Sequence, residues 1–294
     1  MTSEWIAVDW GTSNLRAWAM QGDKPIAEVG SDKGMGSLTP GTFESALLDI
    51  IEPWLDTPKT VVACGMVGAK QGWCEAPYIP VPAKPTDPTK IITAPAKDPR
   101  ISFQILPGMS QTTPADVMRG EETQIAGLIA RNPDFDGVVC LPGTHTKWAR
   151  ISAEEVVNFQ TFMTGELFAL LSKHSVLRHS VGEGWDEDAF TDTLSNTISR
   201  PESFAAKAFS LRAESLLADL PPATARARLS GMLIGMELAA TRQYWLGQHV
   251  VIIGDHTLSK TYQSALATQG LQAELLDAEA LTLAGLSAAR NALT

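Results

Sequence analysis

The pattern of apolar and polar positions divides the chain into short apolar runs and longer amphipathic segments. Five short runs rich in β-branched residues are typical of buried strands. We predict these strands at Trp5–Val8, Thr60–Cys64, Ser102–Leu106, Gly137–Leu141 and Val250–Ile253. The longer segments predict helices at Thr42–Leu55, Asp116–Arg131, Gly165–His174, Glu202–Leu220, Thr224–Trp245, Leu258–Gln269 and Ala278–Ala292. Strands separated by helices indicate an α/β fold.

A proline-rich stretch interrupts this pattern. Nine of the 18 prolines lie between Pro77 and Pro114, so no helix can run through this segment. We expect an ordered irregular excursion or a set of edge strands there, ending near a domain boundary around residue 110. A length of 294 residues is typical of two domains. We therefore predict an N-terminal domain over residues 1–110 and a C-terminal domain over residues 111–294.

The most informative feature is a turn that occurs twice, at an offset of 132 residues. In both copies an apolar strand leads into Gly-Thr and two further polar residues, and a cation and an alanine follow. Successive amides of such a turn form a concave cluster of donors, and glycine allows a close approach to phosphate oxygens. We predict that two strand–turn–strand units bind a polyphosphate through Gly11, Thr12, Ser13 and Asn14 in the first copy and Gly143, Thr144, His145 and Thr146 in the second.

The two copies differ at the end of the first strand, where Asp9 stands in one and Leu141 in the other. A carboxylate beside a phosphate cradle repels the phosphate unless a cation lies between them. Mg²⁺ prefers carboxylates together with substrate phosphates. We therefore predict that Asp9 binds Mg²⁺ directly or through water. The alternative is a strand-end carboxylate that caps the turn.

Composition narrows the class of protein further. There are 23 Lys+Arg and 33 Asp+Glu, and the net charge of −10 disfavours binding to nucleic acid or to an anionic membrane. The mean hydropathy is −0.01 and there is no apolar run long enough to span a bilayer. The N-terminus lacks the pattern of a signal peptide. Three cysteines without close pairs, Cys64, Cys74 and Cys140, predict free thiols in a reducing cytoplasm.

Two motifs and their order resemble a known superfamily. Asp9–Arg16 resembles the first phosphate motif of the sugar kinases, heat-shock ATPases and actin, and Leu141–Trp148 resembles their second phosphate motif. Val250–Asp255, followed by a helix, occupies the place of the adenosine motif. The resemblance implies two ribonuclease-H-like domains with an interdomain cleft, the actin-like ATPase architecture. It also implies nucleotide contacts at Gly254 and Asp255.

More specific strings resemble the 2-dehydro-3-deoxygalactonokinase family within this superfamily. These strings are Gly65–Gly68, Gly72–Tyr78, Pro107–Met109, Arg119–Gln124 and Gly165–Phe168. The resemblance implies a cytoplasmic phosphotransferase that uses ATP and Mg²⁺ to phosphorylate the 6-hydroxyl of 2-dehydro-3-deoxy-D-galactonate in galactonate catabolism. Its partners would be ATP and the sugar acid, and the formation of a homodimer stays open.

The resemblance also indicates a catalytic base. Phosphoryl transfer to a hydroxyl needs alignment, charge neutralisation and a carboxylate that accepts the proton. Relatives generally have Asp after the glycine of the string that includes Gly120, where this chain has Glu121. We assign Glu121 as the general base and keep Glu122 as the alternative. Acidic residues in the first turn of a helix also complement its dipole, which is the structural interpretation of both residues.

A sugar acid needs a cation or donors for its carboxylate and polar groups for its hydroxyls. The resemblance places most of this site in the N-terminal domain, where the candidates are Arg16, Lys33, Gln71, Trp73, Tyr78 and Arg119. An arginine fork suits a carboxylate, which favours Arg119. The alternatives are packing roles for the two aromatic residues and a solvated loop charge for the lysine.

Two other functions remain open at this point. The chain could phosphorylate another sugar or sugar acid, such as 2-dehydro-3-deoxygluconate, or it could be a non-catalytic regulator that binds ATP or sugar on the same fold. The presence of both Asp9 and Glu121 favours catalysis.

Overall fold

The computed structural model describes residues 3–293, and these divide into two compact units. The first unit contains the described residues up to Asp136, together with Ile151–Asn158 and the segment from Asp277 onward. The second unit contains Gly137–Arg150 and Phe159–Leu276. No helix within residues 3–293 is long and apolar enough to cross a membrane.

The first unit is built on a six-stranded sheet with the order β3-β2-β1-β4-β7-β6. Its strands are β1 (Trp5–Trp10), β2 (Leu15–Gln21), β3 (Lys24–Ser31), β4 (Lys59–Gly65), β6 (Ile92–Thr93) and β7 (Ile101–Ile105). A small sheet has the order β5-β8-β9 and consists of β5 (Tyr78–Pro80), β8 (Gly108–Thr112) and β9 (Ala115–Met118). The helices are α1 (Phe43–Ile51), α2 (Glu121–Arg131) and α9 (Ala278–Asn291).

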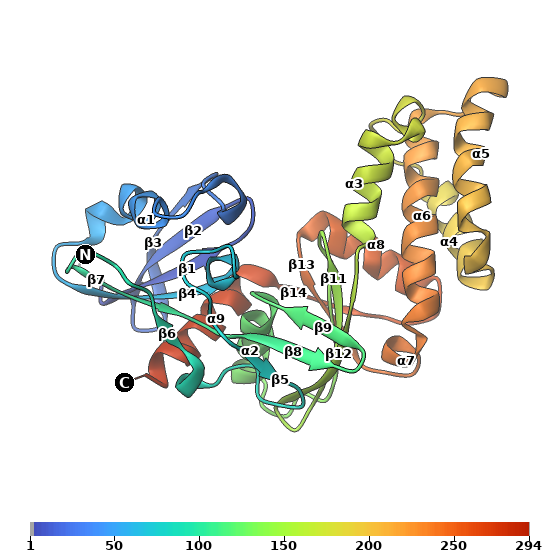
Figure 1. Ribbon diagram of the computed structural model, residues 1–294. Coiled ribbons are helices and arrows are strands. Elements are labelled where there is room, and N and C mark those ends of the chain that lie inside the picture. Colours follow the sequence, from blue (N-terminus) through green and yellow to red (C-terminus); the bar gives the residue numbers. More distant parts are fainter. Residues whose placement is uncertain (1–2, 294) are drawn as a thin grey trace. The chain divides into compact units, whose positions relative to one another are not determined.

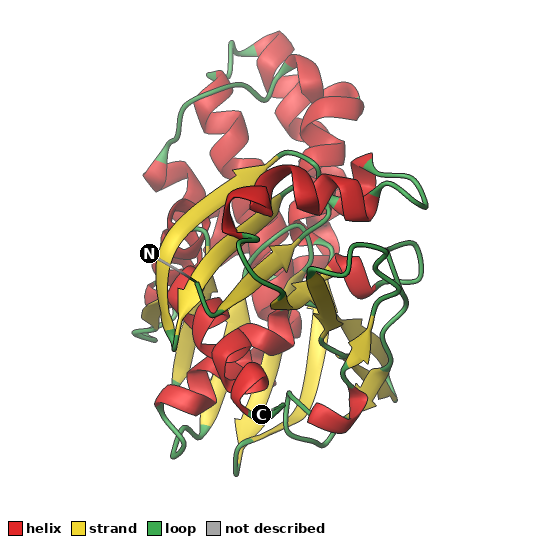
Figure 2. Ribbon diagram, turned by 90° about the vertical axis from the view of Figure 1, so that its left-hand side faces the viewer, coloured by secondary structure: helices red, strands yellow, loops and turns green. Residues whose placement is uncertain are grey.

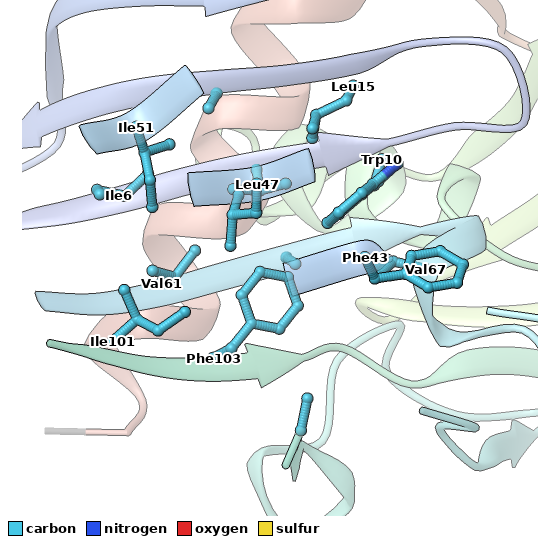
Figure 3. Packing of buried hydrophobic residues seen from close by; sticks show 14 of the residues in the cluster. Ile6, Trp10, Leu15, Phe43, Leu47, Ile51, Val61, Val67, Ile101 and Phe103 are labelled. Carbon is cyan, nitrogen blue, oxygen red and sulfur yellow. The ribbon is translucent and has the colours of Figure 1, made fainter. Parts of the chain in front are cut away.

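Strand β1 is buried on both faces because neither face carries polar residues until Asp9. One face packs against α1, where Ile6 and Trp10 meet Phe43 and Leu47 (Figure 3). The residues of the opposite face form a second cluster with leucines of α9. Helices therefore cover both faces of the sheet (Figure 2), which explains the apolar runs without alternation in this part of the sequence.

A five-stranded sheet has the order β12-β11-β10-β13-β14, and most of its residues belong to the second unit. Its strands are β10 (Gly137–Leu141), β11 (Thr146–Ser152), β12 (Glu155–Phe162), β13 (Val250–Gly254) and β14 (Glu274–Asp277). The helices of the second unit are α3 (Thr164–His174), α4 (Glu187–Ser199), α5 (Phe204–Leu217), α6 (Pro222–Ala240), α7 (Arg242–Trp245) and α8 (His256–Ala267). Helices α3 to α6 form a group at one end of this unit (Figure 1).

The two sheets repeat one topology. Each predicted phosphate-binding turn, called a phosphate turn below, follows a strand. In each sheet this strand lies between the strand that leaves the turn and a parallel strand from later in the chain, as in β2-β1-β4 and β11-β10-β13. The repeat detected at an offset of 132 residues therefore extends from the turns to the sheets that carry them.

The division of the chain differs from the predicted boundary near residue 110. Helix α2 and the C-terminal helix α9 both belong to the first unit. They cross closely because glycine stands at the contact: a Cβ at Gly127 would lie 1.9 Å from the Leu281 carbonyl oxygen, and one at Gly285 would lie 2.0 Å from the Thr123 carbonyl oxygen. This close packing places Glu121 in the same unit as Asp9 rather than in a different domain.

Local structure departs from the predicted elements at several further places, three of which concern helices. The helix predicted from Asp116 begins at Glu121, because the preceding residues pair with β8 and Gly120 has a φ of 105°. The helix predicted over Thr224–Trp245 is divided into α6 and α7. Helix α4 was not predicted, and the proline-rich stretch is ordered into short strands, as expected.

Candidate active site

The first phosphate turn connects β1 to β2 and is closed by a hydrogen bond from the Gly11 amide to the Asn14 carbonyl oxygen at 2.9 Å. Thr12, Ser13 and Asn14 are exposed. A Cβ at Gly11 would make only an ordinary contact, at 3.6 Å from the Asn14 carbonyl oxygen. The turn therefore presents polar groups to solvent, as a phosphate site requires.

A second loop supports this turn from behind. The Met35 amide donates to the Gly11 carbonyl at 3.0 Å, and the Gly36 amide donates to the Thr12 carbonyl at 2.9 Å. Gly34 lies so close that a Cβ would be 2.2 Å from the Ser13 carbonyl carbon. The glycines of this loop therefore allow it to pack against the backbone of the phosphate turn.

Asp9 faces Arg16 across the β1–β2 pair. The Arg16 Nη2 lies 2.6 Å from the Asp9 Oδ2, and its Nη1 lies 3.5 Å from the Glu279 Oε2. Residues 3–293 contain no cluster of three or more metal-ligating side chains. One partly exposed carboxylate fits Mg²⁺ only in the form that this ion prefers, with phosphate oxygens of the nucleotide completing its coordination.

The two glutamates at the start of α2 have different environments. Glu122 is 1% exposed, and its carboxylate oxygens accept from the Gly120 amide at 2.8 and 2.6 Å. Glu121 is half-buried, and its Oε2 accepts from the Arg119 amide at 3.1 Å. An acceptor hydroxyl can reach only a carboxylate that is at least partly open. The geometry therefore favours Glu121 over Glu122 as the base.

Close glycine packing brings the start of α2 to Asp9. Gly65, at the end of β4, has a φ of 91°, and its ideal Cβ position is 3.4 Å from the Asp9 Oδ1. The ideal Cβ position of Gly120 is in turn 3.4 Å from the Gly65 Cα. One glycine thus lies against both the predicted metal ligand and the residue that precedes the predicted base.

Burial raises the pKa of Glu122 to about 8, and repulsion from Glu121 adds to this rise. The folded protein therefore binds a proton that the unfolded chain loses above its ordinary pKa of 4.5. Folding stability falls as the pH rises from 4.5 to about 8 and is lowest above pH 8.

We expect Glu122→Gln to raise the melting temperature relative to the wild type, with a larger gain at pH 9 than at pH 5. Thermal melts across this range would measure the difference, and a gain independent of pH would contradict the assignment.

The predicted acceptor residues divide into two groups. Arg119 is buried, its Nη2 donates to the Ala76 carbonyl at 2.8 Å, and its guanidinium carbon lies 4.4 Å from the centre of the Tyr78 ring. Its Nε and Nη1 are buried and have no hydrogen-bond partner within the described structure. Two donor groups of Arg119 thus have no partner among residues 3–293, and its guanidinium stacks on the partly exposed Tyr78 ring. Arg119 is therefore the strongest candidate in the first unit for binding a carboxylate.

The other predicted acceptor residues of the first unit have different surroundings. Lys33 pairs with Asp49 at 2.7 Å, in a surface pocket of about 370 Å³ that does not include Arg119. Trp73 packs into the core, with its ring centre 4.6 Å from that of Phe103. Gln71 is exposed in the loop before it. The pocket beside Lys33 is thus separate from Arg119, whereas the loop that carries Gln71 and Trp73 continues to Ala76, whose carbonyl accepts from Arg119.

The second phosphate turn connects β10 to β11, and the start of α3 supports it. The Glu166 amide donates to the Thr144 carbonyl at 3.0 Å, and the Glu166 carboxylate lies 2.6 Å from the His145 Nε2. A Cβ at Gly165 would lie 2.3 Å from the Gly143 carbonyl oxygen. Gly143 itself has open space at its Cβ position. Each phosphate turn is therefore backed by a glycine from another segment.

A cavity of about 640 Å³ lies beside this turn, entirely within the second unit. Asp255 lines it and caps α8, since its Oδ1 accepts from the Thr257 and Leu258 amides at 3.0 and 3.1 Å. Gly254 packs near the Pro142 carbonyl, which precedes the turn. The structure thus brings together the second phosphate turn and the adenosine-type motif. Thr146, also predicted to bind phosphate, is buried, and its hydroxyl is hydrogen-bonded to the Tyr262 hydroxyl at 3.0 Å.

Three residues that line this cavity were not predicted from the sequence: Phe168, Trp185 and Arg226. The Arg226 guanidinium carbon lies 5.1 Å from the centre of the Phe168 ring, and Trp185 is 41% exposed. The pair Gly184–Trp185 is a weak signal for this cavity in the sequence. The cavity offers aromatic surface for a planar base and a cation for an anionic group.

The duplicated sheet topology and the two turns define the two-domain actin-like ATPase architecture. An activator of 2-hydroxyisocaproyl-CoA dehydratase from Clostridium difficile, solved with bound ADPNP, has this fold. It superposes with a TM-score of 0.52 at 12% identity, covering 98% of this chain and 95% of the activator. The chain belongs to the 2-keto-3-deoxy-galactonokinase family, whose model matches residues 9–289.

Relatives match over nearly their whole length. A "Probable 2-dehydro-3-deoxygalactonokinase" of Rhizobium meliloti is 40% identical over 98% of this chain and 97% of the relative. The 2-dehydro-3-deoxygalactonokinase of Escherichia coli is 33% identical over 100% of this chain and 99% of the relative. The crystal structure of a "putative 2-dehydro-3-deoxygalactonokinase protein" from Sinorhizobium meliloti has a TM-score of 0.91 at 39% identity, covering 98% and 96% of the two chains.

Proposed function

We propose that this protein is a kinase that transfers the terminal phosphoryl group of ATP to the 6-hydroxyl of 2-dehydro-3-deoxy-D-galactonate in galactonate catabolism. The observation that carries the proposal is the family match over residues 9–289, which spans both phosphate turns and the adenosine-type motif. We further propose that the enzyme acts in the cytoplasm, where its three free cysteines stay reduced.

The second unit would bind the nucleotide. Its cavity would hold the adenosine between aromatic surface and the start of α8, and the amides of Gly143 and Thr144 would bind phosphate oxygens. Asp9 would hold Mg²⁺ together with the phosphates, and the ion would neutralise charge on the transferred group. Arg16 keeps the Asp9 carboxylate oriented.

The first unit would bind the acceptor and accept its proton. Glu121 would take the proton from the attacking hydroxyl, and Arg119 with Tyr78 would receive the acid group of the sugar. Because the chain carries a net charge of −10, the positive potential for two anionic substrates has to come from local groups. The amides of the phosphate turns, Mg²⁺, Arg16 and Arg119 are such groups.

A coupled assay of ADP release tests the proposal. The purified protein would be mixed with ATP and Mg²⁺ and with a panel of aldohexoses and keto-deoxy sugar acids that includes the galactonate and gluconate derivatives. We expect the highest kcat/KM with 2-dehydro-3-deoxy-D-galactonate. Activity on glucose without activity on any keto-deoxy acid would overturn the proposal, and so would the absence of turnover with every acceptor.

The turn glycines allow a direct test of phosphate binding. Because a Cβ at Gly143 meets no atom within 4 Å, Gly143→Ala is expected to leave the melting temperature nearly unchanged. The added methyl would instead occupy the space that a phosphate oxygen needs. We expect the KM for ATP to rise by about tenfold, the scale of one lost hydrogen bond to a charged group. Gly11→Ala should behave in the same way, and an unchanged KM in both variants would exclude these turns as the phosphate site.

A further inference from the structure

A buried carboxylate lies behind the second phosphate turn. Glu237 in α6 is 2% exposed. Its Oε1 accepts from the Trp148 Nε1 at 2.8 Å, and its Oε2 accepts from the Tyr262 hydroxyl at 2.8 Å and from the Thr164 hydroxyl. The carboxylate does not line the cavity, but two of its donors, Thr164 and Tyr262, do. It therefore acts on the site through other residues.

The three donors come from three elements that border the turn or the cavity. Trp148 belongs to β11, the strand that leaves the turn. Thr164 is the first residue of α3, which supports the turn through the next two residues. Tyr262 belongs to α8, and its hydroxyl also lies 3.0 Å from that of Thr146 in the turn. One side chain thus connects three elements that border the predicted nucleotide site in this unit.

The position of Glu237 is costly for packing alone. Burial raises its pKa to about 7, against the opposing effect of the three hydrogen bonds. The neighbours of Glu237 along α6 pack into apolar clusters on two faces of the helix, and an apolar residue at this position would avoid the cost of desolvation. A buried network whose hydrogen bonds are all satisfied can instead hold its members in one arrangement.

We propose that Glu237 is a positioning residue for nucleotide binding: its carboxylate joins β11, α3 and α8 and so fixes the second phosphate turn against the cavity. This inference rests on the proposed function, because it assigns the turn and the cavity to ATP. It concerns affinity for the nucleotide and leaves the binding of the acceptor unchanged.

The test compares two variants of the full-length protein with the wild type. Glu237→Leu keeps the volume but removes every accepted hydrogen bond. We expect it to raise the Kd for ADP, measured by calorimetry with Mg²⁺, and the KM for ATP by about tenfold, which corresponds to about 1.4 kcal/mol. The KM for the acceptor should stay unchanged. Glu237→Gln should retain most of the affinity, because its oxygen still accepts from Trp148 and hydroxyl groups can turn to accept from its amide.

A control separates positioning from general stability. Ile198→Val removes one methyl from the apolar cluster that also contains Trp148 and Tyr262, but it removes no hydrogen bond and does not line the cavity, so it should lower the melting temperature without changing the Kd for ADP. An unchanged Kd in Glu237→Leu, or an equal rise in the control, would overturn the inference. A glutamine variant as weak as the leucine variant would contradict the role of the hydrogen bonds.

Two further results remain decisive. If Glu237→Leu does not fold, Trp148→Phe removes a single donor and keeps one six-membered aromatic ring, and a raised Kd for ADP supports the inference while an unchanged Kd overturns it. If the wild type itself does not bind ADP, the proposed function fails and this inference fails with it.

Discussion

Replacement of Glu121 by glutamine is expected to lower kcat by about 10²-fold or more, the usual size of a general-base effect. Glutamine keeps the size of the side chain but cannot accept the proton of the attacking hydroxyl. Glu121 is assigned to the acceptor hydroxyl rather than to the nucleotide, so the KM for ATP should change little. Steady-state kinetics with ATP and the sugar acid would measure both constants, and turnover near that of the wild type would exclude Glu121 as the base.

The neighbouring glutamate provides a matched control. Glu122→Gln makes the same chemical change one residue further along α2, at a carboxylate that is 1% exposed and faces the Gly120 amide. We expect this variant to keep its kcat. A large loss of kcat in Glu122→Gln together with normal turnover in Glu121→Gln would identify Glu122, rather than Glu121, as the base.

The second large effect on activity is expected from replacing Gly34, a residue to which we assign no role in phosphoryl transfer itself. A Cβ there would lie 2.2 Å from the Ser13 carbonyl carbon, 2.4 Å from the Thr12 carbonyl oxygen and 2.5 Å from the Asn14 amide nitrogen. Backbone atoms cannot rotate away as a side chain can, so Gly34→Ala must displace the first phosphate turn or its supporting loop. We expect destabilisation of about 1–3 kcal/mol. We also expect a fall of about 10²-fold in kcat/KM for ATP, since misplacement by about 1 Å has effects of this size.

Gly30 offers the control in the same segment. A Cβ there would make only an ordinary contact, 3.6 Å from the Leu15 carbonyl oxygen, and Gly30→Ala should therefore leave kinetics and melting temperature close to those of the wild type. Chemical denaturation and kinetics on both variants would measure the contrast. If both behaved alike, the close packing of Gly34 on the turn would not be needed for activity.

Much of the fold could be predicted because its signals are local. The strand at Gly137–Leu141 was predicted with its observed bounds, and the repeated turns were predicted from short strings of residues. Helix α4 was missed although Phe190, Leu194 and Ile198 recur at helical spacing and Asp186 caps its start. The many polar residues of this segment make its apolar face hard to recognise in the sequence. Only the packing in the second unit shows that these three apolar side chains are buried.

The domain boundary could not be predicted, because it depends on contacts between distant segments. The sequence places Ala278–Asn291 at the end of the chain, but glycines in α2 and α9 allow these helices to cross closely within the first unit. The same packing places the start of α2 beside Gly65 and Asp9. No pattern along the chain carries this information, since each glycine is explained only by the backbone that it meets.

By itself, the sequence determined the chemistry of the candidate site: two glycine-containing turns for phosphates, a carboxylate before the first turn, and two adjacent glutamates after a glycine. Only the tertiary structure showed that Glu122 is buried while Glu121 is partly exposed, gave the turns their supporting glycines and revealed Glu237 behind the second turn. The physical reason is that residue type and spacing specify which groups can bind or react. Burial and close packing between distant segments decide which of them are open, which are held in place and which hold the others.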